Sequence, residues 1–412
     1  MIDSFWVPTR LHFGIHTIEN LAEFRGDFSG RHALLITSRF HAKQGEVVEG
    51  IIKQLTTMGI VTEMFAGVHA EPTSALVDSV SEIRRLSKCD LIIALGGGSV
   101  VDVAKFVAMM ATNGGRCADY ETGRAVAKSP LPLVAMPTTA GSGSELTPYG
   151  VIINSQTRRK FTVSSTHFYP RSAVVDPALS VSQPAMITLA SGLDAWIQAL
   201  EAYLSAQSNA LITPLIESVL KAVPSSLSAL LMNPSDLIGR AELSRSAAMG
   251  GIIISHLRTG LVHTMSVALS AHVDLPHGLL NAVILPWVLE FNFESCDRER
   301  LDFLYSTTFL PLSCPHAFSG HPRELQQVDS RLKQAGVTAG FSREGTLAFD
   351  RIGDWLKKLG VPETLSKFKL DERIIPSLVN RVKQDSGLPA VNPRSFSADD
   401  LAGLFRKVLF DA

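Results

Sequence analysis

The stretch LIIALGGGSVVDVAK, Leu91 to Lys105, decides the fold of this chain. Its first five residues form a continuous apolar run, which is typical of a strand buried on both faces of a parallel sheet. Three glycines and Ser99 follow, and apolar residues at helical spacing resume at Val100. Because glycines have no Cβ, an anion can approach the amide groups of such a turn closely. The order of strand, glycine turn and helix predicts a site for the pyrophosphate of a dinucleotide.

The same glycines also fit a plain tight turn between a strand and a helix. The stretch lacks the GxGxxG spacing of the Rossmann fingerprint, so the local pattern alone leaves both interpretations open. Asp102 is predicted to lie in the first turn of the helix, where the helix dipole favours a negative charge.

Length and composition set the broad class. A chain of 412 residues with 46% hydrophobic content suggests two or three domains. The formal net charge of -1 argues against nucleic acid or an anionic membrane as a partner. The N-terminus lacks the pattern of a secretory signal, and no apolar run approaches the roughly 20 residues of a membrane-spanning helix. The four cysteines form no CxxC pair, which indicates ordinary thiols of a cytoplasmic protein.

The pattern of apolar residues divides the chain into two parts. Short strand-like runs alternate with helical patterns up to about residue 180, which predicts an α/β domain with a parallel sheet over residues 1–180. The runs lie at Arg31–Thr37, Val61–Phe65, Leu91–Leu95 and Leu133–Met136, with a helix expected at Gly45–Met58. Phe5 to Gly14 suits an edge hairpin or an exchanged strand.

Long helical patterns dominate after residue 180 and predict an all-α domain over residues 181–412. They cover residues 184–205, 211–231, 235–255 and 347–359. The cleft between the two domains is the expected place for chemistry. Cys314, His316 and His321 lie between prolines, so we interpret them as loop residues and not as a second metal site.

The helical part carries a candidate ligand set for a metal. Asp194 and Gln198 are four residues apart and therefore share a helical face, where a buried acid needs a partner. His263 and His277 lie in a mainly apolar stretch further on. One carboxylate and two imidazoles would make the three-ligand set of a catalytic divalent metal. The alternative is a capping aspartate with two histidines that only fill the core.

Several motifs resemble those of the iron-containing, or group III, alcohol dehydrogenases. GGGSVVDVAK resembles the GGGSxxDxAK signature of that family, and PTTAGSGSE, from Pro137, resembles its PTTAGTGSE motif. SGLDAxxxAxEAY, HxMxxxL and DLPHGxxNAxxLPxVxEFN resemble its metal-binding segments, and NPR recurs at residues 392–394. The resemblance runs from Phe5 to about Asn292. It implies an α/β dinucleotide-binding domain followed by a helical metal-binding domain, an architecture shared with dehydroquinate synthases.

The resemblance implies roles for particular residues. Those matching cofactor-contacting positions are Ser38, Arg39, Gly96, Gly97, Gly98, Ser99, Asp102, Thr138, Thr139, Ser142, Ser144, Lys160 and Leu179. Those matching metal ligands are Asp194, His263 and His277. The family members often dimerise through the N-terminal strand, so a homodimer through Phe5 to Phe13 is expected.

The chain departs from the family at three positions near the metal. Gln198 stands in place of a fourth ligand, histidine, and an amide oxygen is a weak ligand for a borderline cation. Val267 replaces a histidine credited with proton transfer, and Trp287 replaces another. His272 or a water chain is then the candidate proton donor. An Asp/His/His set resembles the zinc-using glycerol dehydrogenases and favours Zn²⁺ over Fe²⁺, with a metal-free relative as the alternative.

Residue 38 bears on the choice of nucleotide. Many family members that use NAD carry an aspartate at this position, and its charge would repel a 2′-phosphate. Ser38 removes that repulsion and Arg39 offers a cation. NADP(H) is therefore favoured, with NAD(H) as the alternative.

The expected reaction is metal-assisted hydride transfer between NAD(P)H and a small, specialised aldehyde. A phosphonoacetaldehyde-type reductase is one example, with Arg258 as the candidate contact for an anionic substrate. Two other classes remain open: a dehydroquinate synthase-like lyase that uses NAD transiently, and a cofactor-binding protein without turnover.

Overall fold

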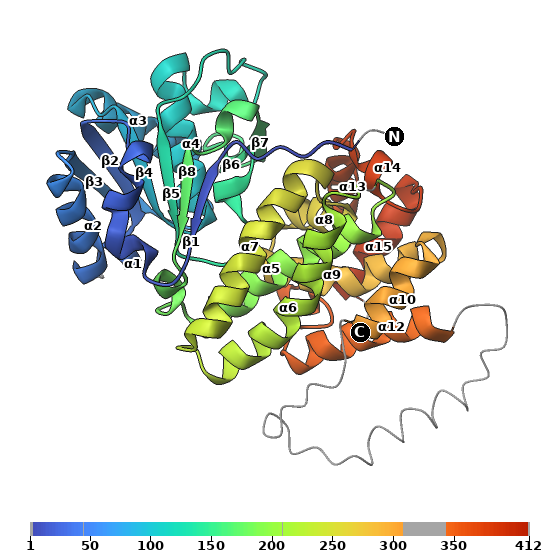
Figure 1. The fold of residues 1–412 in the computed structure, drawn as a ribbon. Helices are drawn as coiled ribbons and strands as arrows, with labels where there is room; N and C mark the ends of the chain where they lie inside the picture. The colour runs from blue at the N-terminus through green and yellow to red at the C-terminus, as the bar shows by residue number, and fades with distance from the viewer. Residues whose placement is uncertain (1–2, 44, 208, 308–342, 411–412) are drawn as a thin grey trace.

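The structure is a computed structural model that describes residues 3–43, 45–207, 209–307 and 343–410. Figure 1 shows two parts side by side, an α/β domain and a helical domain. The N-terminal segment runs from the edge of the sheet across to the helical domain, where the amide of Asn209 donates to the Ser4 carbonyl.

A six-stranded sheet forms the centre of the α/β domain. Its strands are β1 (Arg10–Phe13), β2 (His32–Ser38), β3 (Val61–Val68), β4 (Leu91–Gly96), β5 (Leu133–Pro137) and β8 (Ser172–Val175). They lie in the order β1-β8-β5-β4-β2-β3, and every pair is parallel. Each residue of β4 is buried, as the continuous apolar run predicts. The predicted parallel sheet is confirmed.

Helices cover both faces of this sheet because alternate strand residues point to opposite sides. Ile93 and Leu95 pack with α2 (Gly45–Thr57) and the 3₁₀ segment Thr17–Asp27. Ile92 and Ala94 pack on the other face with α3 (Ser74–Ser87) and α4 (Gly98–Asn113). The short helix α1 (Arg39–Ala42) directly follows β2.

The N-terminal strand differs from the prediction. Phe5 to Gly14 forms no hairpin: β1 is a single edge strand that lies parallel to β8 of the same chain. The alternation of residues identified an extended segment, but it carried no information about the partner strand. A hairpin does form elsewhere, between β6 (Tyr149–Ile153) and β7 (Lys160–Ser164), where none was predicted.

The second part of the chain is helical, as predicted. Its helices are α5 (Ala185–Leu204), α6 (Thr213–Met232), α7 (Leu237–Leu257), α8 (Leu261–Leu269), α9 (His277–Asn292), α10 (Arg298–Thr307), α12 (Arg343–Lys358), α13 (Ile375–Lys383), α14 (Leu388–Val391) and α15 (Ala398–Phe410). Helix α5 lies at its centre, with Trp196 and Leu200 fully buried. Cys314, His316 and His321 lie outside the described residues.

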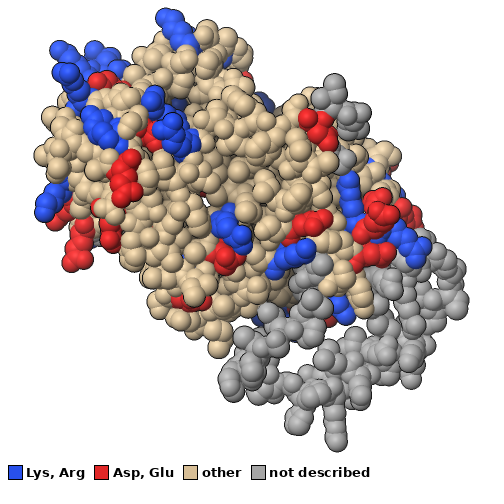
Figure 2. Space-filling view, viewed as in Figure 1, with Lys and Arg blue, Asp and Glu red and all other residues tan. Residues whose placement is uncertain are grey.

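Within the described ranges, α6 alone is a single helix long and apolar enough to cross a bilayer, and α7 with α8 meet the same criterion only as a pair bent by 101°. Ile216, Val219 and Leu220 of α6 are buried in the core of the helical domain. On the face shown in Figure 2, acidic and basic side chains are interspersed, and neither sign covers it.

Glycine contacts join the two domains where the loop after β5 meets the helices. A Cβ on Gly251 of α7 would lie 2.3 Å from the carbonyl oxygen of Gly143, and Gly143 has a φ of +61°. A Cβ on Gly141 would lie 2.7 Å from that of Ser191 on α5. Backbone therefore rests directly on backbone between the domains, and no side chain fits between them.

We expect Gly251→Ala to lower the free energy of unfolding by about 1–3 kcal/mol, because the new methyl group meets rigid backbone. Urea or thermal unfolding measures the change. Gly403→Ala in α15 is the matched control, since a Cβ there meets nothing within 4 Å. In that control the free energy of unfolding should rise by up to about 1 kcal/mol, because alanine has a higher helix propensity than glycine. Equal changes in the free energy of unfolding of the two variants would contradict the close contact between the domains.

Candidate active site

The dinucleotide site is expected where the order of strands in the sheet reverses. The chain passes from β2 to β3 on one side and returns to β4 on the other, so the carboxyl ends of β2 and β4 flank the reversal. A cavity of about 450 Å³ lies there. It is lined by Ser38, Arg39, Phe40, Gly67, Val68, His69, Ala70, Gly97, Ser99 and Val100. The structure thus brings Ser38 and Arg39 to the same cavity as the glycine turn.

The glycine turn also serves the packing of a neighbouring loop. A Cβ on Gly97 would lie 3.0 Å from Oγ1 of Thr139, and one on Gly98 would lie 2.6 Å from Oγ of Ser142. Helix α4 begins at Gly98 without a side-chain cap, so its first turn is open to an anion. The glycines therefore allow two close approaches: that of the loop and that expected for a phosphate.

Asp102 lies outside the first turn of α4, contrary to the prediction, because the helix begins at Gly98. Its carboxylate accepts a hydrogen bond from Oγ of Ser144 at 2.7 Å. Burial raises the pKa of Asp102, while the charge of Lys105 and the Ser144 hydrogen bond oppose that shift. Asp102 and Ser144 thus join helix α4 to the loop after β5.

The other predicted cofactor residues lie at different depths. Ser38 caps α1 by accepting from the amide of His41, while Arg39 is exposed. Thr138 and Leu179 are buried, and Leu179 packs in the core beneath the sheet. Lys160 begins β7, and its charge acts on both Asp102 and His277.

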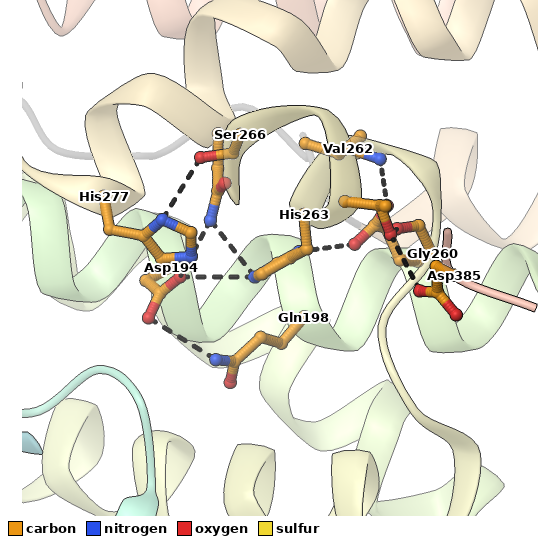
Figure 3. A network of polar contacts seen from close by, with 11 residues as sticks. Asp194, Gln198, Gly260, Val262, His263, Ser266, His277 and Asp385 are labelled. Atoms are coloured by element: carbon orange, nitrogen blue, oxygen red, sulfur yellow. Dashed lines mark hydrogen bonds and ion pairs between the residues drawn. The ribbon is translucent and has the colours of Figure 1, made fainter. Parts of the chain in front are cut away.

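The three predicted metal ligands converge. One ligand atom each from Asp194, His263 and His277 lies within 4.8 Å of the others. Oδ1 of Asp194 is 3.3 Å from Nε2 of His263 and 4.0 Å from Nε2 of His277. Figure 3 shows these side chains pointing toward one another from α5, α8 and α9. Carboxylate and imidazole ligands suit a divalent metal such as zinc, so the residues present fit a metal.

Helix packing around a glycine makes this convergence possible. His277 is the first residue of α9, and a Cβ on Gly278 would lie 1.8 Å from the carbonyl oxygen of Ala190 on α5. The same Cβ would lie 2.9 Å from the Cβ of Asp194. Only glycine lets the start of α9 come close enough to α5 for His277 to face Asp194.

The electrostatics of the site favour a deprotonated Asp194. Burial alone would raise its pKa, but the hydrogen bond from His263 and the charges of both histidines lower the pKa below its usual value. Burial opposes the protonation of His263, yet Glu201 and Asp194 together raise its pKa to about 9. Burial lowers the pKa of His277. The positive charges of Lys160 and His263 lower it further, whereas the negative charge of Asp194 raises it.

A surrounding layer of polar residues was not predicted. Glu201 accepts from Nδ1 of His263 at 2.5 Å and from the amide of Val262 at 2.6 Å. Oγ of Ser266 lies 3.1 Å from Nδ1 of His277. These contacts turn each Nε2 toward the ligand cluster. Glu201 lies two helical turns after Asp194, and that spacing was the signal that could have identified it.

Gln198 is buried beside Asp194, with its amide nitrogen 3.4 Å from Oδ2. Its amide oxygen has no hydrogen-bond partner among the described residues. Leaving a buried acceptor unpaired costs about 1–3 kcal/mol, which marks this position as unusual.

Two further candidates lie elsewhere than expected. The side chain of His272 is exposed in the turn after α8. Arg258 is engaged by Asp385, whose two carboxylate oxygens each lie 2.8 Å from Nη2. The role of Arg258 as a contact for an anionic substrate stays a prediction, and such a substrate would compete with Asp385 for this guanidinium.

A cavity at the reversal of a parallel sheet, together with a cluster of candidate metal-ligand residues in the helical domain, is typical of a nicotinamide-dependent oxidoreductase. The family model of iron-containing alcohol dehydrogenases matches residues 8–177, and the model of their C-terminal domain matches residues 188–409. The chain belongs to the iron-containing alcohol dehydrogenase family. It is an enzyme that passes hydride between a nicotinamide dinucleotide and an alcohol or aldehyde.

Individual relatives agree over the whole length. Alcohol dehydrogenase 4 of Schizosaccharomyces pombe is 31% identical over 99% of this chain and 89% of its own. An NAD-dependent methanol dehydrogenase of Bacillus methanolicus is 27% identical over 98% of this chain and all of its own. The crystal structure of a 1,3-propanediol oxidoreductase superposes with a TM-score of 0.85, at 26% identity over 99% of this chain and 100% of that one.

We expect Glu201→Gln to weaken metal binding by roughly 10–100-fold, because the neutral amide no longer fixes the orientation and basicity of His263. Chelator competition with purified protein measures the affinity. Glu290→Gln is the control, since the Glu290 carboxylate pairs with Lys407 at the surface. Unchanged affinity in Glu201→Gln would contradict this role.

Proposed function

We propose that this enzyme is a metal-dependent reductase of a small aldehyde that prefers NADP(H). The observation that carries the proposal is the convergence of Asp194, His263 and His277, in a chain whose parallel sheet has a cavity at its strand reversal. Their donor set of one oxygen and two nitrogens supports Zn²⁺ over Fe²⁺, since the fourth histidine of the iron-type site is replaced by Gln198. When bound, the metal supplies positive charge that polarises the substrate carbonyl, and the nicotinamide supplies hydride.

The chain's own residues position the reaction. Glu201 and Ser266 orient the two histidines, and the loop held by Asp102 and Ser144 shapes the cofactor side. The side chain of His277 is 34% exposed, so the cluster opens to solvent on that side. We assign delivery of the proton to solvent at this opening, with His272 as the alternative donor.

The surroundings of the cluster favour a small substrate without a strong negative charge. Val267 and Ser266 of α8 are uncharged, and Arg258 is neutralised by Asp385. Two relatives are named for methanol and 1,3-propanediol, which are small neutral alcohols. A phosphonoacetaldehyde-type substrate would need a cation, and it would compete with Asp385 for Arg258.

The edge of the sheet supports a homodimer. Leu11 and Phe13 of β1 are 39% and 40% exposed, and β1 is an edge strand of the sheet formed by the described residues. A second copy that covered this edge would bury those apolar side chains. The cytoplasmic location stays a prediction.

A panel of aldehydes with NADPH and NADH tests the proposal, with cofactor oxidation followed by absorbance. We expect turnover of small neutral aldehydes, loss of activity after chelation and recovery with Zn²⁺. Phosphonoacetaldehyde is included as the anionic alternative. Full activity in protein shown to hold no metal would overturn metal dependence, and substrate conversion without net cofactor oxidation would indicate lyase chemistry.

We expect Ser38→Asp to lower kcat/KM for NADPH by at least about tenfold while that for NADH is kept, because a carboxylate here repels a 2′-phosphate. Ser38→Asn is the matched control, since it has the same shape without the charge. Both residues cap helices well, so α1 should be preserved in each variant. A strong preference for NADH in the unaltered enzyme would contradict the assignment.

A further inference from the structure

Asn281 is a fully buried polar side chain at the metal-ligand cluster. It lies on α9, four residues after His277 and therefore on the same helical face. Its amide nitrogen is 2.9 Å from Oδ1 of Asp194 and 3.1 Å from Nε2 of His263. Its amide oxygen has no hydrogen-bond partner in the described parts of the chain.

We propose that the side-chain oxygen of Asn281 is the fourth protein ligand of the metal. The proposal rests on the metal site under the proposed function and adds a ligand to it. Asn281 then takes the role for which Gln198 is the obvious candidate by sequence position.

The distances place the tip of Asn281 where a ligand atom belongs. Ligand atoms bound at about 2.0–2.2 Å around one ion lie roughly 3.0–3.5 Å from one another. The amide tip of Asn281 is 2.9 Å from Asp194 and 3.1 Å from His263, and those two ligand atoms are 3.3 Å apart. The separations of 3.1 and 3.3 Å lie within this range, and that of 2.9 Å is just below it.

The present contact of Asn281 with His263 is incompatible with a bound metal. Nδ1 of His263 donates to Glu201, so Nε2 is the ring atom left for the metal; it must give up the proton that it shares with Asp194 before its single lone pair can bind an ion. That lone pair cannot serve an amide N–H and a metal together. A half-turn of the amide exchanges nitrogen and oxygen, which are nearly equal in size, and presents the unpartnered Oδ1 to the ion.

Gln198 is aimed differently. Its amide nitrogen faces Oδ2 of Asp194, the oxygen that does not face His263, at 3.4 Å. Its amide oxygen lies on the side of α7, where a Cβ on Gly250 would be 3.2 Å from it. Gln198 therefore supports Asp194 from outside the ligand cluster, whereas Asn281 points into it.

Metal binding to the purified full chain, stripped of metal, tests the inference. The affinity for Zn²⁺ comes from chelator competition, and the absorption spectrum of the Co²⁺-loaded protein reports the ligand set. The variants are Asn281→Asp, Asn281→Leu and, as the matched control, Gln198→Leu, which removes the other buried amide.

We expect Asn281→Asp to bind Zn²⁺ at least about tenfold more tightly, because a carboxylate oxygen is a stronger ligand than an amide oxygen. Asn281→Leu should bind at least about tenfold more weakly. Both variants should shift the Co²⁺ spectrum, while Gln198→Leu should leave its band positions unchanged. If Asn281→Leu does not fold, the inference is decided by whether Asn281→Asp binds Zn²⁺ more tightly or more weakly than the unaltered chain.

Weaker Zn²⁺ binding by Asn281→Asp would overturn the inference, because a residue that only donates a hydrogen bond to Asp194 becomes repulsive when it is charged. An unchanged Co²⁺ spectrum in Asn281→Leu would overturn it as well. If the unaltered chain binds no Zn²⁺ or Co²⁺, the metal-dependent function itself fails. If it binds metal without a contribution from Asn281, the function stands and the inference alone fails.

Discussion

The buried carboxylate of Asp194 is the group on which the arrangement of the helical domain depends. A carboxylate in an apolar interior is unfavourable unless it is paired and hydrogen-bonded. Its partners come from α8 and α9 as well as from its own helix: His263, His277, Asn281 and Gln198. These three helices must therefore meet at one point, and Gly278 removes the side chain that would keep α9 away from α5.

Backbone contacts fix the position of the two domains relative to each other. Gly143 and Gly251 touch without intervening side chains, so the loop after β5 rests directly on α7. The opposite side of that loop packs on the glycine turn through Thr139 and Ser142. The same loop also contacts α5 through Gly141 and Ser191, so it packs between the glycine turn and the helix that carries Asp194. Hydride transfer needs such fixed distances, because a small misplacement of the reactants slows the reaction strongly.

Two buried amide side chains lie beside Asp194, one on α5 and one on α9. Gln198 leaves a buried amide oxygen unpaired, and Asn281 does the same on the facing helix. Neither amide oxygen has a hydrogen-bond partner among the described residues, and a bound cation would supply one. Gln198 and Asn281 are thus the two buried amides that could complete a ligand set of Asp194, His263 and His277.

The amino-acid sequence by itself determined the class of fold. The apolar run of β4 and the glycine turn after it follow from local patterning, as do the long helices after residue 180, because these patterns depend on neighbouring residues. Motif resemblance also predicted Asp194, His263 and His277 as metal ligands, and the structure brings the three side chains together. Only the tertiary structure decided that β1 lies parallel to β8, that Asp385 neutralises Arg258, and that Glu201 and Asn281 surround the ligands. Those outcomes depend on contacts between segments far apart in the chain, which no local pattern encodes.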